Sequence, residues 1–192
     1  MEPRKTVVTG VMLVLVIVGI SIGASVFAFK PSTDTYTTEQ PQLTGITTDR
    51  DLLELGLQVP GSWTFNLSNG STVNLNNLTG KVILVDLMTT WCGTCATQNS
   101  NLQTIYDTLG GQVYVLSLTV DRTETIAMMA DYKSAKHLSW DHGVDTGSSF
   151  SNYFKVTSVP TMVLIDGNGY FRYVHIGLWS VASISARITS IS

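Results

Sequence analysis

The most apolar part of the chain lies at its N-terminus. Residues 7–29 carry no charged side chain, and a helix of this length measures roughly 34 Å, enough to cross the hydrocarbon core of a bilayer. Arg4 and Lys5 precede this run, and the positive-inside rule therefore places residues 1–6 in the cytoplasm. The pattern predicts a single transmembrane helix that acts as a signal anchor.

A cleaved secretory signal is the alternative interpretation of the same run, with Val26 and Ala28 as the small residues before the cut. Either interpretation exports the remainder of the chain. Residues 30–45 are polar, rich in Thr and Pro, and without periodicity, which is typical of a tether. We therefore expect the folded domain to occupy residues 46–192.

Strand and helix patterns alternate through this domain. Two alternating segments, 63–67 and 72–75, flank the turn sequence "SNGS" and predict a β-hairpin. Continuous apolar runs rich in β-branched residues predict buried strands, and apolar residues at helical spacing predict helices. The strands expected after the hairpin are 81–88, 112–120, 161–166 and 170–176, and the expected helices are 95–109, 123–136, 148–154 and 181–191. This order predicts an α/β fold with a mixed central sheet flanked by helices.

The charge balance excludes one class of partner. The chain has 11 Lys and Arg against 14 Asp and Glu, a net charge of -3. Nucleic-acid binding requires clustered basic side chains, and the sequence has no such cluster, so we expect no nucleic-acid partner. The apolar fraction of 44% is sufficient for a buried core.

Both cysteines of the chain stand in "TTWCGTCATQ", where only Gly93 and Thr94 separate Cys92 from Cys95. They follow the predicted strand 81–88 and begin a helix, where unpaired backbone N–H groups and the helix dipole stabilise a thiolate. We therefore expect Cys92 to be the exposed nucleophile. Cys95, one turn later and more buried, is placed to resolve a mixed disulfide formed at Cys92.

A purely structural role accounts less well for the cysteine pair. A disulfide that closes so short a loop stabilises a fold by only about 2 kcal/mol. A structural zinc ion needs four ligands, and the three histidines form no second ligand pair. We expect a redox-active Cys92–Cys95 disulfide to carry the electrons, and therefore expect no metal and no organic cofactor.

The segments "VILVDLMTTWCGTC" and "SVPTMVLID" together resemble the thioredoxin fold. The resemblance is closest to the membrane-anchored, extracytoplasmic thiol–disulfide oxidoreductases of the TlpA/ResA type. It covers about residues 55–192 and includes an N-terminal β-hairpin extension. It implies an oxidoreductase at the cell membrane, with the domain outside the cytoplasm. Its partners would be protein thiols and disulfides and an exported or membrane electron donor.

The resemblance also implies roles for individual residues. Trp91 corresponds to the tryptophan that flanks the active site, and Pro160 to a cis-proline whose loop lies against the cysteines. Val159 would offer its backbone to an extended substrate segment. Gly93 and Thr94 complete the residues expected to contact a substrate.

Asp86 stands inside an apolar strand, where a carboxylate is costly unless it is paired or protonated. It lies at the position of the buried acid of thioredoxins, which implies general acid/base catalysis at the second cysteine. Ser117 aligns with the lysine that lies near that acid in thioredoxin. We therefore expect desolvation to dominate the pKa of Asp86.

One dipeptide and two single positions depart from the TlpA/ResA pattern. Gly93-Thr94 replaces a dipeptide that often contains proline and that tunes the reduction potential, so the direction of electron flow stays open. Gln98 stands where many members have an acid, and Ser100 where they have a proline.

A copper-binding metallochaperone on the same fold is the alternative function. Such a protein would bind the metal through Cys92, Cys95 and a distant histidine, either His175 or His142. The spacing of the cysteines is shorter than is typical of that class. The sequence therefore favours the oxidoreductase.

Overall fold

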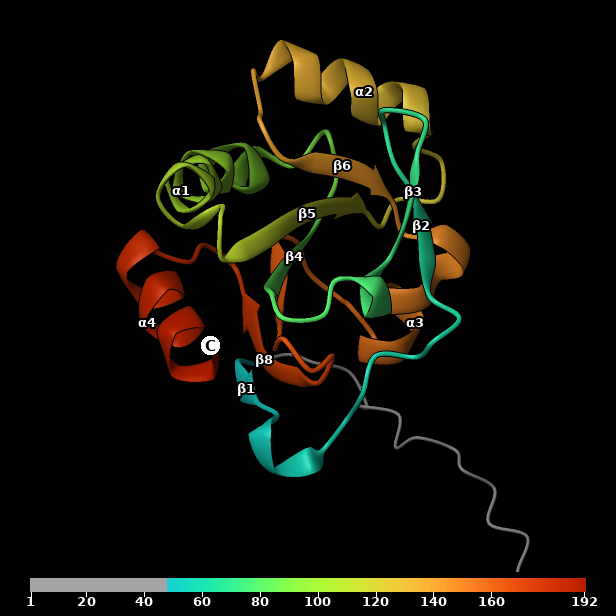
Figure 1. Cartoon of the computed structure of the whole chain (residues 1–192). Helices are drawn as coiled ribbons and strands as arrows, with labels where there is room; N and C mark the ends of the chain where they lie inside the picture. Colours follow the sequence, from blue (N-terminus) through green and yellow to red (C-terminus); the bar gives the residue numbers. More distant parts are fainter. Residues whose placement is uncertain (1–47) are drawn as a thin grey trace, which may run out of the picture. The chain divides into compact units, whose positions relative to one another are not determined.

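The computed structural model describes residues 48–192 (Figure 1). The predicted cytoplasmic segment 1–6, the transmembrane helix 7–29 and the tether 30–45 lie outside this range. Between residues 48 and 192, no helix has the length and apolar character that a membrane span requires.

A six-stranded mixed sheet forms the centre of the domain, in the order β1-β8-β7-β4-β5-β6. Strands β4, β5 and β6 are parallel, whereas β7, β8 and β1 join by antiparallel pairing. The bounds are β1 Arg50–Asp51, β4 Val82–Met88, β5 Val113–Thr119, β6 Asp141–Val144, β7 Thr161–Ile165 and β8 Phe171–Ile176. The expected mixed α/β sheet is confirmed.

Helices cover both faces of this sheet (Figure 1). The helices α1 and α4 lie together on one face, and α2 packs beside the edge strand β6; apolar side chains of all three join the same buried cluster. The helix α3 contributes to the cluster on the opposite face. The bounds are α1 Gly93–Leu109, α2 Ile126–Ala135, α3 Ser149–Phe154 and α4 Val181–Ile191, with short 3-10 turns η1 Leu53–Leu55, η2 Leu75–Asn77 and η3 Thr146–Ser148.

A separate antiparallel pair, β2 (Thr64–Asn66) and β3 (Thr72–Asn74), precedes the central strand β4. It docks on the edge of β6, where Ser68 N–H donates to the carbonyl of His142 over 2.7 Å. Gly143 permits this approach, because a Cβ there would lie 2.3 Å from the Asn66 carbonyl oxygen. The sequence pattern does not predict β6, since its sequence "DHGV" has Asp and Gly, which are poor strand formers.

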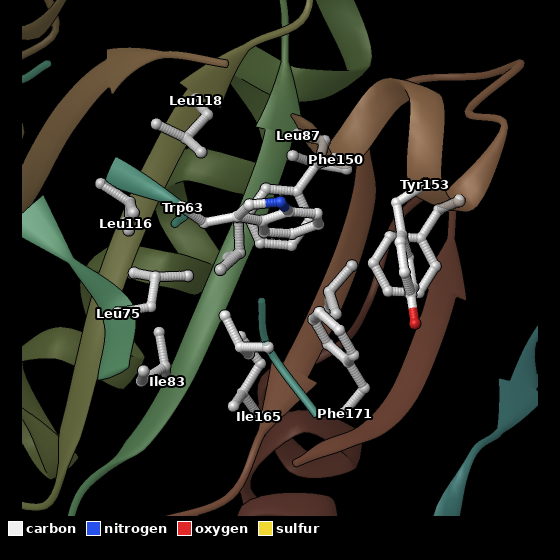
Figure 2. Close-up of a cluster of buried hydrophobic side chains, with 14 of the residues drawn as sticks. Trp63, Leu75, Ile83, Leu87, Leu116, Leu118, Phe150, Tyr153, Ile165 and Phe171 are labelled. Atoms are coloured by element: carbon white, nitrogen blue, oxygen red, sulfur yellow. The ribbon is translucent and has the colours of Figure 1, made fainter. Parts of the chain in front are cut away.

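Trp63 joins the segment before the hairpin to the core beneath α3 (Figure 2). Its ring centroid lies 4.7 Å from that of Phe150 and 5.5 Å from that of Tyr153. Phe65 and Phe171 complete the group, at 6.2 and 5.9 Å. Such ring contacts stabilise the fold beyond the burial of apolar area alone. This aromatic cluster therefore holds the segment before the hairpin against the sheet.

Trp63→Ala should lower the free energy of unfolding by about 3–5 kcal/mol, because it leaves a cavity in the aromatic cluster. Trp91→Ala is the matched control, since Trp91 is 72% exposed whereas Trp63 is 9% exposed; we expect it to change stability by about 0.5 kcal/mol or less. Urea unfolding of the oxidised protein measures both values. Equal destabilisation by the two substitutions would contradict the role of Trp63 in the core.

Candidate active site

The two cysteines lie where the central strand passes into helix α1. Residues 89–92 follow β4, and α1 begins at Gly93 with Cys92 as its N-cap. Cys92 and Cys95 form a disulfide, with their Cα atoms 5.2 Å apart. Cys92 is 7% exposed and Cys95 is 1% exposed. Both cysteines are therefore buried in the oxidised protein, which corrects the expectation of an exposed Cys92, although Cys92 is the more accessible residue of the two.

Backbone and side-chain donors surround the Cys92 sulfur. The Cys95 backbone N–H donates to Cys92 Sγ over 3.0 Å, and Thr94 Oγ1 lies 3.3 Å from the same sulfur. In the reduced protein these two donors would stabilise a thiolate at Cys92, in addition to the helix dipole.

The loop before β7 lies against this sulfur. The Val159–Pro160 peptide bond is cis, as the resemblance implies, and the Val159 carbonyl oxygen lies 3.9 Å from Cys92 Sγ. Val159 is half-buried and Thr157 and Ser158 are exposed. The structure therefore brings together Cys92, Cys95, Val159 and Pro160.

Trp91 and Gly93 flank Cys92 in the sequence, and both are exposed. Trp91 lines a groove of about 310 Å³ together with Val156 and Val159. Its indole Nε1–H donates to Asp121 Oδ2 over 3.0 Å, which orients the exposed ring. A Cβ at Gly93 would meet no atom within 4 Å, so packing does not require glycine at this position.

Asp86 lies in β4 under helix α1. It alternates with Leu84 and Met88, which belong to the cluster that contains both cysteines, so its side chain faces that side of the sheet. The carboxyl group is 1% exposed, and burial raises its pKa from 3.8 to about 7. The hydroxyl of Ser117 donates to Asp86 Oδ2 over 2.8 Å and opposes that rise. The expectation that desolvation dominates is confirmed.

Sequence reasoning missed two carboxylates in the loop after β5. Glu124, which is 6% exposed, accepts the backbone N–H of Thr90 over 2.9 Å and the hydroxyls of Thr90 and Thr119. Asp121 holds the Trp91 indole. Because the parallel strands β4 and β5 end at the same edge of the sheet, acids directly after β5 could have been placed beside the cysteines. Both carboxylates position the segment that carries Cys92.

Gln98 explains one departure from the TlpA/ResA pattern. Its fully buried side chain donates to the Trp179 carbonyl over 3.1 Å and accepts the Trp179 N–H over 2.8 Å. An ionised glutamate could accept but not donate. The amide therefore ties helix α1 to the loop before α4 in a way that the usual acid could not.

The two histidines of the copper alternative have other partners. His175 Nδ1 lies 2.8 Å from Asp49 Oδ2, and its Nε2 lies 3.0 Å from the Leu178 carbonyl. His142 is buried, with Nδ1 at 3.0 Å from the Trp140 carbonyl. In the part of the chain that the structure describes, no three His, Cys, Asp or Glu side chains gather in a way that could hold a metal ion.

Comparisons with known proteins agree with this geometry. The family model described as Redoxin matches residues 55–183. The chain is 24% identical over 126 residues to "Thiol-disulfide oxidoreductase ResA" of Bacillus cereus, covering 65% of this chain and 71% of that protein. It is 30% identical over 103 residues to "Thiol:disulfide interchange protein DsbE" of Escherichia coli, covering 51% of each.

The solved structure of StoA from Bacillus subtilis has the same fold, with a TM-score of 0.57 at 18% identity, over 67% of this chain and 97% of that one. The family match spans well over half of the chain. The chain therefore belongs to the Redoxin family, and within it is a thioredoxin-like thiol–disulfide oxidoreductase of the ResA type.

Proposed function

We propose that this oxidoreductase works outside the cytoplasm, anchored to the cell membrane by residues 7–29, and exchanges disulfides with partner proteins through Cys92 and Cys95. Cys92 is the nucleophile and Cys95 the resolving residue. The support for the location is the uncharged N-terminal run and the basic residues before it.

The reduction of a partner proceeds in two exchanges. The Cys92 thiolate attacks one sulfur of the partner's disulfide, forms a mixed disulfide and releases the other sulfur as a thiolate. The Cys95 thiolate then attacks Cys92 Sγ, forms the Cys92–Cys95 disulfide and releases the second sulfur of the partner. Two electrons have passed to the partner, and an exported or membrane thiol donor must return them before the next cycle.

The observation that carries this proposal is the position of Cys92 Sγ. It receives a backbone N–H at the start of α1 and lies 3.9 Å from the carbonyl of the cis-proline loop. An extended partner segment that pairs with the backbone of Val159 would place its own sulfur beside Cys92. Trp91, Gly93 and Thr94 would contact the residues on either side of that sulfur.

Asp86 supplies the proton chemistry in this proposal. Cys95 can attack only as a thiolate, and it is almost fully buried. A carboxyl group with a pKa of about 7, on the same side of the sheet, is suited to take that proton near neutral pH and to return it in the reverse reaction.

The roles of the two cysteines can be separated by substitution. Cys92→Ser should abolish thiol-dependent reduction of insulin, because no nucleophile is left at the start of α1. Cys95→Ser should instead accumulate a mixed disulfide between Cys92 and insulin, visible on a non-reducing gel, since resolution is blocked. Mixed disulfides that form at Cys95 in the Cys92→Ser protein would reverse the assignment. A Cu(I) titration of the reduced wild type, run alongside, tests the copper alternative.

Asp86→Asn should slow resolution on the order of 100-fold, because it removes the proton acceptor for Cys95. The rate is measured as release of a chromogenic thiol from a preformed mixed disulfide with Cys92. In the wild type the rate should rise with pH and level off above about pH 7, as Asp86 ionises, and the variant should lose this inflection. Identical profiles between about pH 6 and about pH 9 would remove the role of Asp86.

The same carboxyl group should make stability depend on pH. Its pKa is raised in the fold, from 3.8 to about 7, so the unfolded chain loses a proton between these values that the folded protein keeps. The stabilisation is complete below about pH 4 and is lost as the pH rises to about 7. Relative to Asp86→Asn, the oxidised wild type should lose on the order of 4 kcal/mol across this window.

Urea unfolding of the oxidised proteins at a series of pH values measures this difference. Asp131→Asn, at an exposed position of α2, is the matched control and should show a constant difference from the wild type. A constant difference for Asp86→Asn as well would show that burial does not raise the pKa of Asp86.

A further inference from the structure

Three fully buried side chains form a hydrogen-bonded chain toward Asp86. Trp140, immediately before β6, donates its indole Nε1–H to Ser117 Oγ over 2.9 Å. Ser117, in β5, donates its hydroxyl to Asp86 Oδ2 over 2.8 Å. Their exposures are 2%, 0% and 1%, so these bonds are shielded from bulk solvent.

The chemistry of the three groups fixes the direction of the bonds. An indole N–H can only donate, and a serine hydroxyl has a single hydrogen. Because Ser117 Oγ accepts from Trp140, its hydrogen is free to point at Asp86. A hydrogen bond of this direction is stronger to a carboxylate than to a neutral acid.

The neighbouring ring of His142 holds the indole in place. The His142 ring stacks on Trp140 with centroids 5.2 Å apart, and its Nδ1 lies 3.0 Å from the Trp140 carbonyl, which can only accept. The Nδ1 therefore carries the hydrogen. Burial lowers the pKa of His142 to about 4, so the ring is neutral when it makes this contact at neutral pH.

Within residues 48–192, few other groups act on the Asp86 carboxyl. Met162 of β7 is its register partner on one side and Ser117 on the other. Tyr132 of α2 and Glu124 of the preceding loop face this region. Desolvation is the main cause that raises the pKa of Tyr132, and the charges of Asp86 and Glu124 add to the rise. Asp86 forms no ion pair with a cation of residues 48–192, and within that range its Oδ1 has no hydrogen-bond partner.

We propose that Trp140 and Ser117 are positioning residues that form a fixed donor relay to Asp86, stabilise its carboxylate form and so set the pH at which it titrates. The relay takes the place of a cationic partner, which is missing from the described contacts of Asp86. The effect of the relay on catalysis rests on the proposed function, in which the Asp86 carboxylate takes the proton of Cys95. The titration of Asp86 then determines the pH above which that carboxylate is present.

The relay is tested by the ¹³C chemical shift of the Asp86 carboxyl group, followed against pH in the oxidised protein. Ser117→Ala keeps the shape of the site but removes the donor, and should raise the titration midpoint by about one pH unit or more. Trp140→Phe keeps a ring against His142 but removes the indole N–H, and should raise the midpoint by less. Tyr153→Phe removes a buried hydroxyl from the opposite face of the sheet and should leave the midpoint unchanged.

An Asp86 midpoint that is the same in Ser117→Ala and wild type would overturn the relay. The kinetics of resolution separate this result from a failure of the proposed function. In one outcome, Ser117→Ala shifts both the titration midpoint of Asp86 and the pH profile of the resolution rate, and it does not change that rate further when Asp86 is already Asn. This outcome supports both the relay and the base role of Asp86. If the midpoint moves but the rate profile does not, the relay stands and the base role of Asp86 fails.

Discussion

The central strand β4 is the constraint on which the site depends. It pairs with β5 on one side and β7 on the other, and every one of its residues is buried. This double pairing fixes the register that turns Asp86 toward α1 and delivers Cys92 to the start of the helix. The antiparallel partner β7 begins directly after Pro160, so the same pairing also places the Val159 carbonyl against the sulfur. A shift of one residue in this register would turn Asp86 to the opposite face.

Among residues 48–192, neutral donors rather than cations interact with the charged groups of the site. The Cys92 sulfur receives the Cys95 N–H and lies close to the Thr94 hydroxyl, and Asp86 receives the Ser117 hydroxyl. The two carboxylates in the loop after β5 also have neutral donors. Glu124 accepts the Thr90 N–H, and Asp121 accepts the Trp91 indole N–H. These acids therefore order the segment before Cys92, while the helix N-terminus favours negative charge on the sulfur.

Most of the sheet and the cysteine helix could be predicted because burial on both faces leaves a continuous apolar run, as in residues 82–88. The strand β6 could not be predicted from the sequence. Its Gly143 is needed because the β2–β3 hairpin lies too close for a side chain, and its His142 is buried because it stacks on Trp140. In the site, spacing and resemblance located the sulfurs, the proline loop and Asp86. The Trp140–Ser117 chain depends on contacts between strands that no local pattern records, whereas Glu124 could have been inferred only from the parallel order of β4 and β5. The absence of a lysine at position 117 correctly indicated that desolvation governs the pKa of Asp86.

The central claim is that the start of α1 makes Cys92 a nucleophile. Its most direct test is the rate of alkylation of each cysteine by iodoacetamide in the reduced protein, followed by mass spectrometry across a range of pH. We expect Cys92 to react much faster than Cys95, and to keep its reactivity at pH values well below about 8.5, where a free cysteine thiol is mostly protonated. A Cys92 that reacts no faster than free cysteine at neutral pH would contradict the account.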